Sequence, residues 1–191
     1  MKNSIDNRLL FPITLIFSTF IFACTPSKLY YQIDPDFSKL QSTFENKELI
    51  YVAVNDHRHS EISSPDRQFI EADIPDAQAL KTKLIQHLKD NDFKIINRVL
   101  LADAGLELNI KVLNLSLDSG VFKNELVGKS ELEIIVHKKS NRWSKSYKAS
   151  RTQEIASPIN EFDTTGVINQ MLSKQLNHIF SDEELINFIA E

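Results

Sequence analysis

The chain contains a single cysteine, Cys24, and only four glycines among its 191 residues. One thiol cannot form an intrachain disulfide or a cysteine-ligated metal site, and so few glycines leave no glycine-rich phosphate-binding loop. Lysine and arginine (22 residues) are outnumbered by aspartate and glutamate (26 residues), which argues against nucleic acid as a partner. No nucleophile elbow is present either. We therefore identify no catalytic residues and expect no cofactor.

The chain has one long apolar run, and it lies at the start. Residues 9–23 carry no charge, follow a short segment containing Lys2 and Arg8, and end with Ala23 directly before Cys24. The run is shorter than the roughly 20 residues that a membrane-spanning helix needs. A basic start, a short apolar stretch and a small residue at the cleavage point are typical of a secretory signal.

The cysteine after this run predicts lipidation. We expect a lipoprotein signal peptide over residues 1–23 and acylation of Cys24, including palmitate, which would hold the protein on a bilayer essentially permanently. Phe22 departs from the pattern, because the residue two before the cysteine is usually small or polar. An uncleaved signal anchor and ordinary secretion are the alternatives. Because Thr25 rather than aspartate follows the cysteine, we expect the outer membrane rather than the inner membrane.

The remainder divides into two parts. Residues 24–47 comprise the lipidated cysteine and a polar tether, in which Tyr30–Ile33 forms a short extended piece before Asp34-Pro35. Residues 48–191 are long enough for a single globular α+β domain with its own core.

Local patterns predict the first elements of this domain. Residues 48–55 carry apolar side chains on both faces, which indicates a central strand. Residues 61–68 are polar and predict a loop, with a hairpin return as the alternative. Apolar residues at helical spacing predict a helix from Asp73 to Asp90, with Pro75 in its first turn and Asp73 or Asp76 as its cap. Residues 93–99 then begin another strand.

Three long alternating segments follow. Residues 106–117 change the parity of their apolar positions between Val112 and Leu113, which predicts a β-bulge or a sharp twist there. Residues 127–137 and 142–155 alternate as well, and short turns join the segments. These features predict an antiparallel meander.

Helical spacing returns at the end of the chain. It predicts a helix from Asp163 to Phe180, and a capping box at residues 181–184 opens a short last helix. The predicted fold is therefore α+β: an antiparallel sheet of about five strands, with two main helices packed on one face and a short C-terminal helix.

A family resemblance rests mainly on the second half of the chain. It comprises the strand that ends in LNLSLDSG, the pair VGKSELEIIVH and RWSKSYKASRTQE, and the helices in GVINQMLSKQLNHIFSDEELINFI. Ile33-Asp34-Pro35 and residues 54–58 match less closely, and Tyr147–Ser150 is the most distinctive piece. With these segments, the chain resembles the YajG-type lipoproteins of Gram-negative bacteria over most of its mature length. The resemblance implies an outer-membrane lipoprotein that faces the periplasm, with no established activity and no catalytic residues to transfer.

The densest polar cluster follows the predicted central strand. It consists of Asp56, His57, Arg58 and His59. Two imidazoles and a carboxylate could bind zinc or copper, but the adjacent arginine repels a cation, so we predict no metal site. A cluster that ties down the following loop is the main interpretation. A binding site in which Arg58 grips a carboxylate or a sugar is the alternative.

Two aromatic residues, Trp143 and Tyr147, share one face of a predicted strand. Core packing is the first interpretation, and an exposed platform for a glycan or a peptide is the second. The sequence as a whole favours a non-enzymatic binding or accessory lipoprotein in cell-envelope assembly or transport, with an envelope protein or a cell-wall component as its partner. The alternatives are a periplasmic enzyme that acts on peptidoglycan, and a lipoprotein that binds a small ligand or a metal.

Overall fold

The computed structural model describes residues 29–38, 48–58, 67–72, 75–119, 123–156 and 158–190. These ranges contain β1 (Tyr30–Tyr31), β2 (Leu49–Asp56), β3 (Arg67–Ala72), β4 (Lys94–Ile96), β5 (Ala104–Ser119), β6 (Asn124–Lys138) and β7 (Asn141–Ile155). The helices are α1 (Asp76–Asp90), α2 (Glu161–Ile179) and α3 (Glu183–Ala190), and a short 3₁₀ turn, η1, spans Val99–Leu101. The predicted signal peptide, Cys24 and His59 lie outside the described residues.

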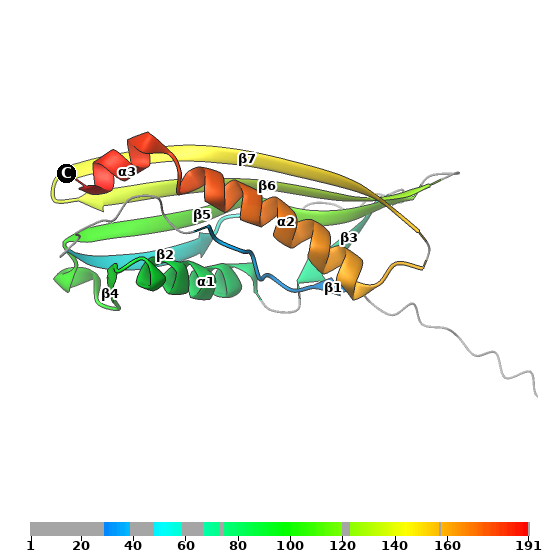
Figure 1. Ribbon diagram of the computed structural model, residues 1–191, viewed down its shortest axis with the longest axis horizontal. Coiled ribbons are helices and arrows are strands. Elements are labelled where there is room, and N and C mark those ends of the chain that lie inside the picture. Colours follow the sequence, from blue (N-terminus) through cyan, green and yellow to red (C-terminus); the bar gives the residue numbers. More distant parts are fainter. Residues whose placement is uncertain are drawn as a thin grey trace, which may run out of the picture.

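The sheet corrects the predicted fold class. Over the described residues it has seven strands and is mixed, not an antiparallel sheet of about five strands, and it curls into a half-barrel (Figure 1). β2 runs parallel to both β4 and β5, and β1 runs parallel to β3. The segment between β2 and β4 contains α1, and a crossover of this length lets two strands lie parallel. The alternation within a strand does not specify its partner, so the sequence did not reveal these pairings. It did not reveal β3 either, whose first two residues lie within the predicted loop of residues 61–68.

The predicted meander is confirmed. β5, β6 and β7 pair antiparallel in that order. The predicted bulge is confirmed as well: the register between β5 and β6 shifts between Ile110 and Val112, which leaves Lys111 as the additional residue. Leu108 and Ile110 are buried before the bulge, and Leu113 is buried after it, at the other parity. The extra residue thus keeps apolar side chains on one face along the whole strand.

The edge of β5 that faces away from β6 is divided between two partners. β2 pairs with its first half, from Ala104 to Ile110, and β3 pairs antiparallel with residues 115–118. Positions 111–114 lie between these two pairings. The bulge therefore lies where β5 changes its neighbour on this edge.

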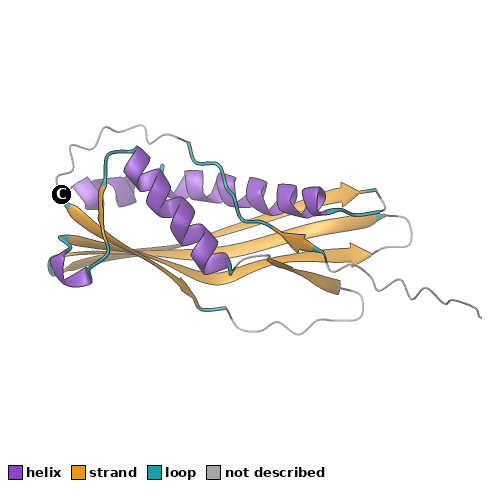
Figure 2. Ribbon diagram, turned by 90° about the horizontal axis from the view of Figure 1, so that it is seen from below, coloured by secondary structure: helices purple, strands orange, loops and turns teal. Residues whose placement is uncertain are grey.

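The helices lie along one face of the curled sheet, as predicted (Figure 2). α1 packs against β2 and β4, and α2 packs against β6 and β7. The core residues that α1 and α2 contribute are Leu80, Leu84, Leu88, Val167, Ile168, Met171, Leu172, Leu176 and Ile179. Gly128 of β6 permits close approach of α2, because a Cβ atom there would lie 3.2 Å from the sulfur of Met171.

Candidate functional site

The predicted polar cluster lies at the end of β2. Asp56 is the last residue of the strand, and the backbone N–H of His57 donates to the carbonyl oxygen of Ile110 at 2.9 Å, which extends the contact with β5 by one residue. The side chain of His57 is exposed. The structure thus places Asp56, His57 and Arg58 together, whereas His59 is outside the described residues.

The guanidinium of Arg58 is engaged on several sides. Its Nε and Nη2 donate to the two carboxylate oxygens of Asp56 at 2.9 and 2.6 Å. Its Nη1 donates to the backbone oxygen of Leu113 at 2.9 Å and forms an ion pair with Asp76. Because Leu113 lies on the stretch of β5 between its pairings with β2 and β3, Arg58 supplies a hydrogen bond where neither strand does. The side chain therefore joins β2, β5 and the start of α1.

Asp76 and Tyr31 complete this network from the other side. Asp76 is the first residue of α1 and is 3% exposed, and the hydroxyl of Tyr31 donates to its two carboxylate oxygens at 3.2 and 3.3 Å. Asp76 makes no side-chain cap for its helix, contrary to one of the two predicted caps. Sequence reasoning did not connect these residues, which are 45 positions apart.

Burial and charge shift the protonation of these groups. Burial raises the pKa of Asp76, although the guanidinium of Arg58 and the hydroxyl of Tyr31 act in the opposite direction. Burial also raises the pKa of Tyr31. Hydrogen bonds from Arg58 lower the pKa of Asp56, which is more exposed. The network thus holds one guanidinium between two carboxylates that differ in their exposure to water.

This arrangement acts as a structural junction. A ligand carboxylate would have to displace Asp56, Asp76 or the Leu113 carbonyl to reach Arg58, so the binding role of the cluster stays a prediction. Across the part of the chain that the structure describes, no group of three or more histidine, cysteine or acidic side chains could hold a metal ion.

A second arrangement was not foreseen. Residues 30–38, which we call the strap, run in extended form along α2, and the backbone N–H groups of alternate strap residues donate to α2 side chains. The donor and acceptor pairs are Gln32 to Thr165 (3.1 Å), Asp34 to Asn169 (2.8 Å), Asp36 to Ser173 (2.8 Å) and Ser38 to Asn177 (2.7 Å). Four helical residues rise by about 6 Å, and two extended residues span about 6.6 Å, so the two repeats stay in step.

The same helix also donates to the strap. The amide of Asn169 donates to the carbonyl oxygen of Gln32 at 2.9 Å, and the hydroxyl of Thr164 donates to that of Tyr30 at 2.7 Å. Side chains on one face of α2 therefore supply the backbone hydrogen bonds that a neighbouring strand would otherwise supply to the strap. The accepting row, an uncharged polar residue at every fourth position, is the sequence signal that could have revealed it.

The strap lies between α1 and α2 (Figure 1). Its odd-numbered residues Tyr31, Ile33 and Pro35 are buried, whereas the even-numbered ones are exposed. The ring of Phe37 stacks on that of His87 of α1, with 4.3 Å between the ring centroids. The sequence assigned these residues to the polar tether, and the structure docks them on the folded body.

His87 lies in an apolar setting beneath the strap. It is 6% exposed, and its Nε2 has no hydrogen-bond partner within the described structure. Burial lowers the pKa of His87, with Asp90 acting in the opposite direction. The contact between α1 and the strap therefore favours a neutral imidazole.

The two aromatic residues of β7 pack inward, as the core interpretation predicted. Tyr147 is 5% exposed, and Trp143 packs partly buried against the core. The Tyr147 hydroxyl donates to Asp182 at 2.7 Å, and the ammonium of Lys145 lies 2.8 Å from the same carboxylate. Burial alone would raise the pKa of Asp182, but these two partners and the backbone N–H of Glu184 lower it to about 2. Asp182 also accepts from the backbone N–H of Glu184, so it caps α3.

The model of a family described as "Uncharacterized lipoprotein" matches residues 35–190. The chain belongs to this family. The predicted likeness to YajG-type lipoproteins is confirmed at this level. Membership of a lipoprotein family indicates a membrane-anchored protein. Among the described residues, no helix is long and apolar enough to cross a membrane.

Several bacterial proteins of known structure share a distant likeness. The lipoprotein GNA1162 of Neisseria meningitidis is 10% identical with a TM-score of 0.41, and the match covers 71% of this chain and 99% of that one. The hypothetical protein CT253 of Chlamydia trachomatis is 11% identical with a TM-score of 0.41, covering 76% and 96%. A minor lipoprotein of Acinetobacter baumannii is 9% identical with a TM-score of 0.38, covering 75% and 90%. A search of curated proteins gives no significant match.

Proposed function

We propose that the protein is anchored in the outer membrane through a lipid on Cys24, faces the periplasm, and acts without catalysis. Its role would be that of a binding or accessory lipoprotein in cell-envelope assembly or transport. Membership of the lipoprotein family supports the membrane anchor. The binding role rests on an exposed apolar turn.

That turn is η1. Its residues Val99, Leu100 and Leu101 are 61%, 97% and 56% exposed. Single exposed apolar residues are common, but consecutive ones that contribute nothing to the core are typical of a contact surface. Arg98, directly before the turn, is exposed as well. The turn therefore presents an apolar tip with a positive charge beside it.

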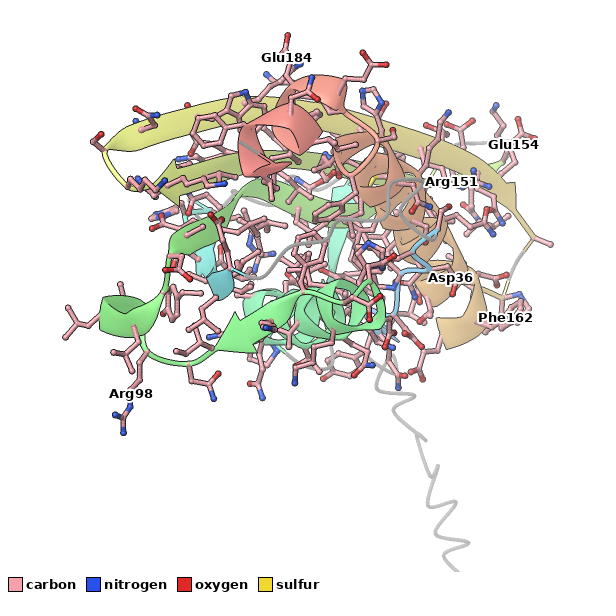
Figure 3. The ribbon with its side chains drawn as sticks, turned by 60° about the vertical axis from the view of Figure 1, so that its left-hand side comes forward. Asp36, Arg98, Arg151, Glu154, Phe162 and Glu184 are labelled. Carbon is pink, nitrogen blue, oxygen red and sulfur yellow. The ribbon has the colours of Figure 1, made fainter. Side chains whose placement is uncertain are left out.

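The position of η1 favours a protein as its occupant. η1 precedes the first residue of β5, whereas β3, which holds β1, pairs with the other end of β5. Ala104 and Leu115 are separated by about 36 Å along the strand. Arg98 and Phe162, which mark the two ends, lie on opposite sides of the molecule (Figure 3). The strap begins at Tyr30 on β3, at the end away from η1. We therefore expect an envelope protein with an apolar pocket and an acidic rim, rather than the anchoring bilayer, to cover the turn.

Site-specific crosslinking tests this role. A photoreactive amino acid replaces Leu100 in cells with native envelopes, and the matched control carries it at Lys94, which is exposed on β4. We expect one reproducible protein adduct from position 100, absent from position 94 and lost when Val99→Ser and Leu101→Ser are added. Equal adducts from both positions, or an adduct that survives the double substitution, would overturn the role of η1.

The anchor has a test of its own. Cys24→Ser should leave the protein unacylated and prevent processing by the lipoprotein pathway. Fractionation and mass measurement of the N-terminal peptide follow both properties. A variant that is cleaved and membrane-bound like the parent would show that Cys24 is not the anchor.

A further inference from the structure

We propose that the bilayer-facing end of the protein is formed by β1 and the first turn of α2, and that the exposed rings of Phe162 and Tyr30 lie in the membrane interface. The partner of this surface is the lipid bilayer that holds the anchor. The inference rests on the proposed lipidation of Cys24 and adds an orientation to it.

The first step is the length of chain before the strap. Leu29 lies five positions after Cys24, and five extended residues span at most about 18 Å. Without a docked strap, the first residue held by the sheet would be Leu49, 25 positions after Cys24, and the extended reach would be roughly 80–90 Å. The strap therefore shortens the reach of the anchor by a factor of about five.

The second step is where the strap begins. The Tyr30 carbonyl accepts from the Thr164 hydroxyl at 2.7 Å, and the Gln32 N–H donates to Thr165 at 3.1 Å. The side chain of Gln32 also reaches Glu161 at 3.4 Å. On its sheet side, Tyr30 pairs with Glu71 of β3. These contacts fix the start of the strap at the first turn of α2, so a lipid on Cys24 would keep that turn close to the membrane surface.

The third step is an aromatic side chain that lies outside the described core. Phe162, the second residue of α2, is 85% exposed and points away from the body of the protein (Figure 3). Tyr30, on the neighbouring strap, is 37% exposed. The buried face of α2 consists of other residues, beginning with Thr164 and Val167. Aromatic rings are enriched at the level of lipid headgroups, where one part of the ring is apolar and its surroundings are wet.

The described charges beside these rings do not favour electrostatic attraction as the cause of the contact. Glu161 and Asp163 lie in the first turn of α2, and Glu71 is exposed on β3. Such a surface is not drawn to anionic lipids, unlike the basic segments that bind them. The contact would therefore be apolar, and added salt, which screens charge, should not weaken it.

Depth-dependent fluorescence quenching tests the orientation. The full-length lipidated protein is placed in vesicles of phosphatidylethanolamine and phosphatidylglycerol that contain a nitroxide-labelled lipid. Because Cys24 is acylated, a cysteine introduced by Glu161→Cys carries the only free thiol and takes the fluorophore. Lys94→Cys, an exposed position near η1, is the matched control.

We expect quenching at position 161 to exceed that at position 94 by at least threefold, to fall when Phe162→Ser is added, and to persist in 0.5 M salt. Equal quenching at both positions, or stronger quenching at position 94, would overturn the orientation. Quenching that Phe162→Ser leaves unchanged would overturn the role of that ring. Loss of vesicle binding together with an unacylated Cys24 peptide would instead overturn the anchor itself, and the orientation with it.

Discussion

Two extended segments of this protein, β6 and the strap, are held in different ways. β6 lies between β5 and β7, and backbone groups pair along both of its edges. Among the described residues, the strap pairs with a strand at β1, and beyond β1 the side chains of α2 accept its backbone N–H groups. Both segments bury alternate residues, such as Leu132 at 0% exposure and Tyr31 at 2%. They differ in what completes their backbone hydrogen bonds.

Because of this difference, side-chain substitutions should affect β6 and the strap in different ways. A backbone ladder survives changes of side chain as long as the strand keeps its position, because every residue except proline supplies the same groups. The strap depends on particular hydroxyl and amide groups of α2. We therefore expect single substitutions to weaken β6 only through the core, and to detach the strap without unfolding the rest.

The largest effect is expected in the meander. Leu132→Ala removes a fully buried side chain from β6 and should lower the free energy of unfolding by about 4 kcal/mol, through lost burial and the cavity left behind. Urea denaturation of the domain measures this change. Lys129→Ala, at an exposed position of the same strand, is the control and should change it by less than about 0.5 kcal/mol. A small loss for Leu132→Ala would mean that β6 does not form the core.

A somewhat smaller effect is expected at the junction of β2, β5 and α1. Arg58→Met leaves the buried carboxylate of Asp76 without its cation and should cost about 3 kcal/mol. Adding Asp76→Asn should recover part of this loss, because the remaining group is then neutral. Equilibrium unfolding of the single and double variants gives the coupling between the two residues. If the losses of stability from the two single substitutions simply add in the double variant, Arg58 and Asp76 do not interact directly.

The strap should respond locally. Asn169→Ala with Asn177→Ala removes the acceptors for the N–H groups of Asp34 and Ser38, which we expect to cost the docked strap about 2 kcal/mol. Because alanine favours the helix, global stability should change less than that.

Hydrogen exchange resolves the two effects. Protection should fall for residues 34 and 38 and stay unchanged in β6. Gln170→Ala with Lys174→Ala, at exposed positions of the same helix, controls for the substitution itself. Equal loss of protection in β6 and the strap would show that the two are not separable.

The smallest effect is a pH dependence at His87. Burial lowers the pKa of His87, so below about pH 6.5 the unfolded chain takes up a proton that the folded chain resists. Stability should therefore fall as the pH decreases from 7 to 5, by at most about 1.4 kcal/mol per pH unit from this group. Strap protection near Phe37, which stacks on His87, should fall with it. In His87→Phe, which keeps an aromatic ring in the stack, this part of the pH slope should be absent. If His87→Phe leaves the dependence of stability on pH unchanged, that dependence comes from other groups.

The sequence predicted the elements whose evidence is local. Alternation marked the meander, and the parity change in β5 marked the bulge at Lys111 to within two residues. Helical spacing located all three helices. These features depend on neighbours along the chain, which a single sequence displays.

The sequence did not reveal contacts between distant parts. The parallel pairing of β2 with β5 joins residues more than 50 positions apart, and nothing in either pattern selects the partner. The strap and α2 are separated by 133 to 139 positions in their N–H contacts. Of the predicted cluster, Asp56 and Arg58 were found without Asp76 and Tyr31, because those two residues have ordinary local interpretations as a cap and a strand residue.

The strap also has a mechanical consequence. It runs parallel to α2, since successive strap residues meet successive turns of the helix. A force applied through the N-terminal chain along the axis of α2 would load these contacts together, in shear, rather than open them one after another. Resistance to such a force depends on the rate of rupture rather than on equilibrium stability. Tension between the proposed anchor and a bound partner would thus be shared between the pairing of β1 with β3 and the polar row of one helix.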